Sequence, residues 1–148
     1  MNTSDISFDA RRRMILSTLW VFVLLNMIYA DILSLMDPVS MIRQIMSGAG
    51  RLPAGLIVGA IFMETSIAMV LLSRILPRKG NRYANIIAAI INIPAVLIGG
   101  RGAYYYFFAV LESLAMLAII ILSVRWPKSA NEERILPNQA PRQPADGS

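Results

Sequence analysis

The 148-residue sequence contains no cysteine and no histidine. Without cysteine the chain forms no disulfide and has no thiol redox chemistry, and without either residue type it builds no Cys or His zinc site and no His-ligated haem site. Catalytic pairs based on Cys or His are excluded as well, so any acid–base catalysis would depend on Asp, Glu, Tyr or Lys. We therefore expect no cofactor and no metal ion.

Charged residues are scarce, at 16% of the chain, whereas 56% of it is hydrophobic and the mean hydropathy is +0.58. A soluble domain is typically about 45–50% apolar. The apolar residues fall in four long blocks, and a soluble domain this small cannot bury four helices that are apolar on every side. The sequence therefore predicts an all-α fold, an integral membrane four-helix bundle, with the lipid bilayer as its partner.

Four membrane spans are expected at about 14–36, 54–74, 83–99 and 103–124, within one membrane domain over residues 14–126. At about 1.5 Å per helical residue, each block is long enough to cross the hydrocarbon core of a bilayer. Residues 1–13 are expected to be a polar cytoplasmic N-terminus. The polar, proline-rich residues 127–148 are expected to be a disordered cytoplasmic tail.

Proline and glycine indicate where the expected spans end. Asp37-Pro38 ends the first span, and residues 39–46 have the pattern of a short interfacial helix. Residues 76–82 are interpreted as a tight basic turn. Pro94 removes a backbone donor inside the third span, which predicts a kink near Ile90.

The basic residues are divided unevenly between the two sides of the expected bundle. Eleven of the 14 lie on the side of the termini: three before the first span, four around the second loop and four after the last span. Arg43, Arg51 and Arg101 lie on the other side. The positive-inside rule then places both termini in the cytoplasm, and we expect the bacterial inner (plasma) membrane. Because the basic residues flank the spans, the net charge of +5 implies no nucleic-acid partner.

Each expected span contains a polar side chain near the middle of the bilayer. Counted from the outer end of its span, Glu64 lies ten residues deep, Glu112 nine, Asn26 ten and Asn92 seven. These depths correspond to roughly 10–15 Å, so we expect the four side chains to share one layer. Asp31 lies nearer the outer mouth, within reach of two possible basic partners, Arg51 and Arg101.

A charged and unpaired carboxylate at the bilayer centre costs about 2.5–3.5 kcal/mol on insertion scales. A shared proton or a bound cation would remove this cost, so Asn26, Asp31, Glu64, Asn92 and Glu112 together predict an intramembrane binding site. In the alternative interpretation each Glu is protonated and only hydrogen-bonds a neighbouring helix.

Helical spacing indicates which residues of a span share one face of the helix. Gly55 and Gly59 form a small-xxx-small pattern, and Gly55 is about 180° around the helix from Glu64. If Glu64 faces the bundle interior, these glycines face a second protomer, or else another helix of the same bundle. In the fourth span one face carries Tyr105, Phe108 and Glu112.

Several segments taken together form a recognisable set: Tyr29–Pro38, Met63–Glu64, Ala68–Arg74, Asn81–Ala88 and Tyr104–Glu112. They are similar to an uncharacterised bacterial family of small four-span membrane proteins, a domain-of-unknown-function family, over about residues 13–126. The layout of the spans also resembles the DoxX-like four-helix membrane proteins. The resemblance implies an integral inner-membrane bundle and assigns no activity.

Two better-known classes of four-span protein fit less well. Vitamin K epoxide reductase-like proteins need a cysteine pair, which this chain lacks. Small multidrug-resistance exporters are similar in size and use an intramembrane Glu in the first span, where this chain has Asn26 and Asp31. Several of them insert in both orientations, which the uneven basic residues of this chain oppose.

The leading functional expectation is binding or transport of a proton, a cation or a cationic amphiphile at the carboxylate cluster, rather than catalysis. The first alternative is a membrane enzyme that uses Glu64 or Glu112 as general acid or base on a lipid-soluble substrate such as a quinone or isoprenoid. The second is an accessory or structural subunit whose acids only lock the helices together.

Overall fold

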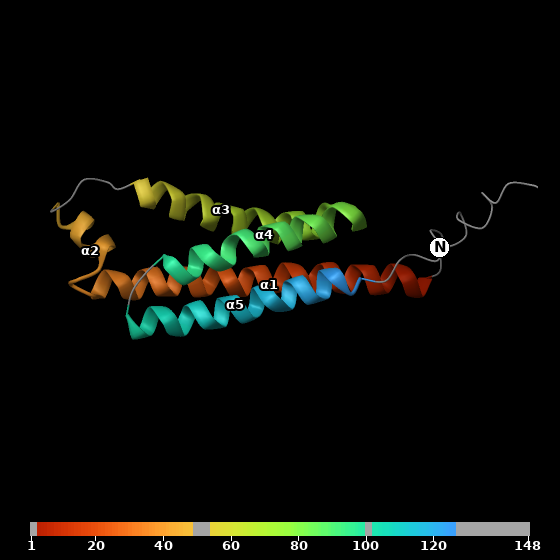
Figure 1. Cartoon of the computed structure of the whole chain (residues 1–148). Helices are drawn as coiled ribbons and strands as arrows, with labels where there is room; N and C mark the ends of the chain where they lie inside the picture. Colours follow the sequence, from red (N-terminus) through yellow and green to blue (C-terminus); the bar gives the residue numbers. More distant parts are fainter. Residues whose placement is uncertain (1–2, 49–53, 100–101, 127–148) are drawn as a thin grey trace, which may run out of the picture.

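The computed structural model describes residues 3–48, 54–99 and 102–126, and all regular structure within these ranges is helical (Figure 1). The helices are α1 (Thr3–Met36), α2 (Met41–Met46), α3 (Ala54–Ile75), α4 (Arg78–Ile98) and α5 (Ala103–Val124). The predicted all-α fold with four long helices is confirmed. The expected disordered tail at 127–148 lies outside the described residues.

The four long helices form an antiparallel bundle (Figure 1). Helix α1 packs against α3 and α5, and α4 packs against the same two helices, so the helices follow one another around the bundle in chain order. The short helix α2 packs against the end of α1. We call the end of the bundle that carries Arg11–Arg13 and Arg78 the basic end, and the end that carries α2 the α2 end.

By length and composition, four helical segments can cross a membrane: Ser7–Met36, Ile57–Ile75, Arg78–Ile98 and Ala103–Val124. Large apolar side chains are exposed along all four, including Ile61, Ile87 and Leu114, which are 55–60% exposed. An outer surface of this kind suits lipid and not water. The chain is a small multi-pass membrane protein. The side of the membrane on which the basic end lies stays a prediction.

Two helices begin earlier than the hydropathy of the sequence indicates. Helix α1 begins at Thr3, whereas residues 1–13 were expected as a separate polar segment. Helix α4 begins at Arg78, so the expected basic turn over 76–82 shrinks to Leu76 and Pro77. Pro77 supplies the extended residue before the helix, and its carbonyl accepts from the backbone N–H of Asn81 at 2.8 Å. Contacts with neighbouring helices hold both extensions.

The other helices begin and end close to the expected positions. Helix α5 spans the same residues as the expected fourth span, and α3 differs from the second span by one residue. The segment expected as a short interfacial helix contains α2, whose N-cap is Ser40: its hydroxyl accepts from the Arg43 N–H at 3.2 Å. Helix α4 continues through Pro94, and the expected kink there stays a prediction.

A buried polar network centred on Asn85 joins three helices in the half of the bundle nearer the basic end. The indole Nε1 of Trp20 on α1 donates to Asn85 Oδ1 at 2.7 Å, and the hydroxyl of Ser73 on α3 donates to the same oxygen at 3.1 Å. Asn85 Nδ2 donates to the carbonyl of Asn81 at 2.8 Å, and Asn81 Nδ2 donates to the carbonyl of Ser73 at 2.6 Å. All four side chains are fully buried. Because each polar group has a partner, the network fixes how α1, α3 and α4 meet.

Arginines of α1 satisfy carbonyls at the C-terminal ends of its neighbours. Arg13 Nη1 donates to the carbonyl of Leu76 at 2.6 Å and to that of Arg74 at 3.1 Å, beyond and within the last turn of α3. Arg12 Nη1 donates to the carbonyl of Leu122 in the last turn of α5 at 2.7 Å. The last carbonyls of a helix lack intrahelical donors and carry the negative end of its dipole, so these contacts are favourable. Arg12 and Arg13 thus close this end of the bundle, in addition to their expected role in topology.

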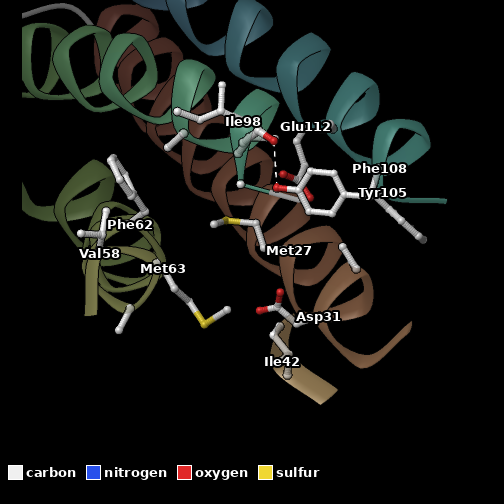
Figure 2. A pocket seen from close by; sticks show the side chains of 17 residues that line it. Met27, Asp31, Ile42, Val58, Phe62, Met63, Ile98, Tyr105, Phe108 and Glu112 are labelled. Carbon is white, nitrogen blue, oxygen red and sulfur yellow. Dashed lines mark hydrogen bonds between the residues drawn. The ribbon is translucent and has the colours of Figure 1, made fainter. Parts of the chain in front are cut away.

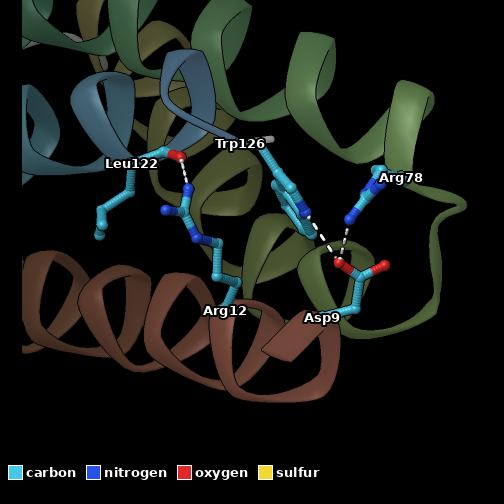
Figure 3. Close-up of polar contacts among 5 residues, drawn as sticks. All are labelled: Asp9, Arg12, Arg78, Leu122 and Trp126. Atoms are coloured by element: carbon cyan, nitrogen blue, oxygen red, sulfur yellow. Dashed lines mark hydrogen bonds and ion pairs between the residues drawn. The ribbon is translucent and has the colours of Figure 1, made fainter. Parts of the chain in front are cut away.

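An ion pair between α1 and α4 closes the same end, together with Trp126, which follows α5 (Figure 3). Asp9 Oδ1 accepts from Arg78 Nη2 at 2.6 Å and from the indole Nε1 of Trp126 at 3.0 Å. The guanidinium of Arg78 also lies 6.0 Å from the centre of the Trp126 ring. The pair is about one-fifth exposed, so its contribution is limited by screening to about 1 kcal/mol or less.

Candidate functional site

A cavity of about 560 Å³ lies in the half of the bundle nearer the α2 end. All four long helices line it, and α2 adds Ile42 (Figure 2). Its wall is mostly apolar and includes methionine, phenylalanine and branched aliphatic side chains: Met27, Val58, Phe62, Met63, Ile98 and Phe108. The volume falls within the range of about 300–1,000 Å³ that small-molecule sites occupy.

Helical spacing places two carboxyl groups in this cavity. On α1, Met27 and Asp31 are four residues apart and share a face. On α5, Tyr105, Phe108 and Glu112 follow at steps of three and four residues, and all three line the cavity as their spacing predicted. Figure 2 shows Asp31 and Glu112 approaching the same space from different helices.

The two carboxyl groups lack partners within the described part of the chain. Glu112 is 2% exposed and Asp31 is half-buried, and neither side chain hydrogen-bonds or ion-pairs with a residue of ranges 3–48, 54–99 or 102–126. No described Lys or Arg lines the cavity. The two groups are close enough to interact electrostatically. Two acids that share an apolar space without a basic neighbour are chemically complementary to a proton or a cation.

Tyr105 also lines the cavity and holds two helices together at its wall. Its hydroxyl donates to the carbonyl of Val96 near the end of α4, at 2.8 Å. Gly99 makes room for this contact, since a Cβ there would lie 2.6 Å from the Tyr105 hydroxyl and 2.8 Å from the carbonyl of Ala95. The phenol therefore joins α4 to α5 at the cavity wall.

The family model described as "Family of unknown function (DUF6326)" matches residues 4–132. The chain belongs to DUF6326. This confirms the expected membership of an uncharacterised family, and the looser DoxX-like resemblance stays a prediction. No curated protein and no solved structure matches the chain.

Glu64 does not meet Glu112 inside the bundle, where the sequence predicted it. In this DUF6326 chain Glu64 is exposed on the outer surface of α3 and does not line the cavity. Helix α3 buries Ser66, Met69 and Ser73 against its neighbours. Glu64 precedes Ser66 by two residues, about 200° around the helix, and so points away from the bundle. The expected meeting of Glu64 with Glu112 inside the bundle is therefore corrected.

The two asparagines of the expected site bond to their own helices. Asn26 is half-buried and its Nδ2 donates to the carbonyl of Phe22 at 2.7 Å. Asn92 is fully buried, its Nδ2 donates to the carbonyl of Ala88 at 2.8 Å, and its Oδ1 has no partner within the described ranges. Neither lines the cavity of this DUF6326 chain. Of the five expected binding residues, the structure thus brings Asp31 and Glu112 to one cavity.

Other expected contacts lie beyond what the structure describes. Arg51 and Arg101, the expected partners of Asp31, lie outside the described residues, and so do the surroundings of Gly55. Gly59 is exposed, lies at the cavity wall and has no atom within 4 Å of the position of a Cβ. The expected homodimer through Gly55 and Gly59 stays a prediction.

Sequence reasoning missed two groups of residues that shape the site of this DUF6326 chain. The wall residues Phe62 and Met63 carry no signal, because an apolar side chain in an apolar span faces lipid or protein equally well. The network that closes the other half of the bundle did leave one signal. Asn81 and Asn85 are four residues apart on a face shared with Asn92, a polar stripe that predicts burial in a membrane helix.

Proposed function

We propose that this chain binds a lipophilic organic cation in the cavity, with Asp31 and Glu112 as its charge partners, in the bacterial inner membrane. One observation carries the proposal: two carboxyl groups enter an otherwise apolar cavity that no described basic residue lines. A ligand with a positive charge would remove the cost of the carboxylates, and its apolar groups would contact the walls.

The shape and chemistry of the cavity favour an organic cation over a single ion. A cavity of about 560 Å³ is far larger than a bare ion needs, and its apolar wall offers few oxygen ligands. Phe62 and Phe108 line it, and aromatic faces attract organic cations. Met27 and Met63 add flexible side chains that adapt to ligands of different shape.

The half of the bundle nearer the basic end limits the route by which such a ligand would cross the membrane. The buried network around Asn85 and the arginine contacts fill the bundle at its basic end. With the basic end in the cytoplasm, as the positive-inside rule predicts, the cavity lies in the outer half of the membrane. The ligand would therefore bind from the outer side. Its transport to the cytoplasm would require the helices to separate at the basic end.

The test uses a pair of ligands that have one shape and opposite charges. Binding of tetraphenylphosphonium and of tetraphenylborate to purified protein would be measured by equilibrium dialysis in detergent. The cation should bind at least about tenfold more tightly than the anion, and Glu112→Gln should weaken cation binding about tenfold, equivalent to about 1.4 kcal/mol. Glu64→Gln is the matched control, because it makes the same change outside the cavity. Equal binding by wild type and Glu112→Gln would contradict the proposal.

The alternative functions give different outcomes in the same samples. An enzyme would convert a quinone or isoprenoid in detergent, without any gradient, and would lose that activity in Glu112→Gln. An accessory subunit would bind neither probe, and Glu112→Gln would change only its thermal stability.

A further inference from the structure

The outer surface of α3 carries an exposed stripe that contains one ionisable residue. The stripe consists of Ile57, Ile61, Glu64, Leu71 and Ile75, which together span an arc of about 80° around the helix. All five are exposed, the four apolar ones by 60–68%. We call this surface the Glu64 stripe. Its apolar members suit lipid, and Glu64 does not.

Glu64 has no partner in the described part of the chain. It forms no hydrogen bond or ion pair with residues of 3–48, 54–99 or 102–126. It lies ten residues from the start of α3, about 15 Å along the helix and therefore near the middle of a bilayer. Hydrocarbon offers neither a donor nor an acceptor, so an ionisable side chain at this depth needs one from another molecule.

Helix α3 has an outer face that its own bundle leaves uncovered. It packs against α1 and α4, and its buried side chains over 57–75 are Ser66, Met69 and Ser73, all on the face opposite Glu64. Ala68 lies next to Glu64 along the stripe, and a small residue there lets a second helix approach closely. The stripe is separate from Gly59, which is about 140° around the helix from Glu64.

We propose that a second copy of this chain docks on the Glu64 stripe, α3 against α3, and that the two Glu64 carboxyl groups hydrogen-bond each other. A protonated carboxyl group is both donor and acceptor, so it is complementary to itself. A twofold axis along the membrane normal brings each residue near the axis opposite its own copy. A second copy therefore satisfies Glu64 without any other component. This interface is independent of the cavity and of its ligand.

The absence of cysteine in the chain makes a direct test simple. Ile61→Cys places a thiol beside Glu64 in the stripe, and Val110→Cys on α5 is the control, since both lie seven residues into their helices and are 60% and 55% exposed. Membranes that contain each variant would be oxidised and the disulfide-linked dimer measured on a gel. The dimer yield should be at least about tenfold higher for Ile61→Cys than for Val110→Cys.

The role of Glu64 is tested in the Ile61→Cys background. Glu64→Leu should lower the dimerisation constant about tenfold, whereas Glu64→Gln should retain most of it because an amide also donates and accepts. The helical circular dichroism and the thermal melt of each purified variant show whether the monomer remains folded. Equal cross-linking at the two cysteine positions would overturn the proposal, as would an Ile61→Cys dimer indifferent to Glu64→Leu. Cross-linking of Ile61→Cys to a different membrane protein in place of its own copy would also overturn it.

Discussion

Replacing Asn85 by Leu tests whether the buried network holds the bundle together. Two interhelical hydrogen bonds end on Asn85 Oδ1, one from Trp20 on α1 and one from Ser73 on α3. Interhelical hydrogen bonds in membrane proteins contribute about 0.6 kcal/mol on average and up to about 1.7 kcal/mol, so losing two should cost roughly 1–3 kcal/mol. Leucine has the same number of side-chain heavy atoms as asparagine and the same branching at Cγ, which limits the change in shape.

The free energy of unfolding would be measured by titrating the detergent-solubilised protein with sodium dodecyl sulfate. Asn92→Leu is the control: Asn92 is fully buried on the same face of α4, and its hydrogen bond is to Ala88 of its own helix. We expect it to cost less than about 1 kcal/mol, because removing a poorly satisfied buried polar group is nearly neutral. A double-mutant cycle with Trp20→Phe should show a coupling energy of about 1 kcal/mol. If the Asn85→Leu and Asn92→Leu proteins had equal free energies of unfolding, the interhelical hydrogen bonds of Asn85 would not stabilise the bundle.

Three further predictions concern the two ends of the bundle. Gly99→Ala should destabilise the protein by about 1–3 kcal/mol, because its Cβ meets the Tyr105 hydroxyl, and Tyr105→Phe should recover part of that loss in the same thermal melt. Asp9→Asn should cost about 1 kcal/mol or less and remove most of the salt dependence of stability at the basic end, as melts from low to high salt would show. In intact bacterial cells a membrane-impermeant maleimide should label Ser47→Cys and leave Lys79→Cys unlabelled; the reverse pattern would refute the predicted orientation.

The helices could be predicted because hydropathy, proline and glycine act along the chain. Asp37-Pro38 places the end of α1 at Met36, and the apolar blocks place α3 and α5 to within one residue. The early start of α1 could not be predicted in this way, because residues 3–13 carry no apolar block. Asp9, Arg12 and Arg13 in this segment contact residues more than 60 positions away in the sequence.

The candidate site shows a second limit of sequence reasoning. The depth of a residue follows from its position in a span, so Asp31 and Glu112 were expected inside the membrane, and both line the cavity. Rotation about the helix axis does not follow from depth. Helix α3 is apolar on nearly every side, and its small buried residues Ser66 and Ser73 decide which face turns inward. The prediction for Glu64 was therefore wrong about the rotation of α3 around its own axis.

The central claim is that Asp31 and Glu112 hold one lipophilic cation in the cavity of a single bundle. The most direct measurement is the anomalous diffraction of crystals of the protein soaked with a brominated quaternary ammonium compound. The account predicts a bromine peak within the cavity, beside Asp31 and Glu112, that is lost in crystals of Glu112→Gln. Bromine peaks confined to the lipid-facing surface, or an unchanged cavity peak in Glu112→Gln, would contradict it.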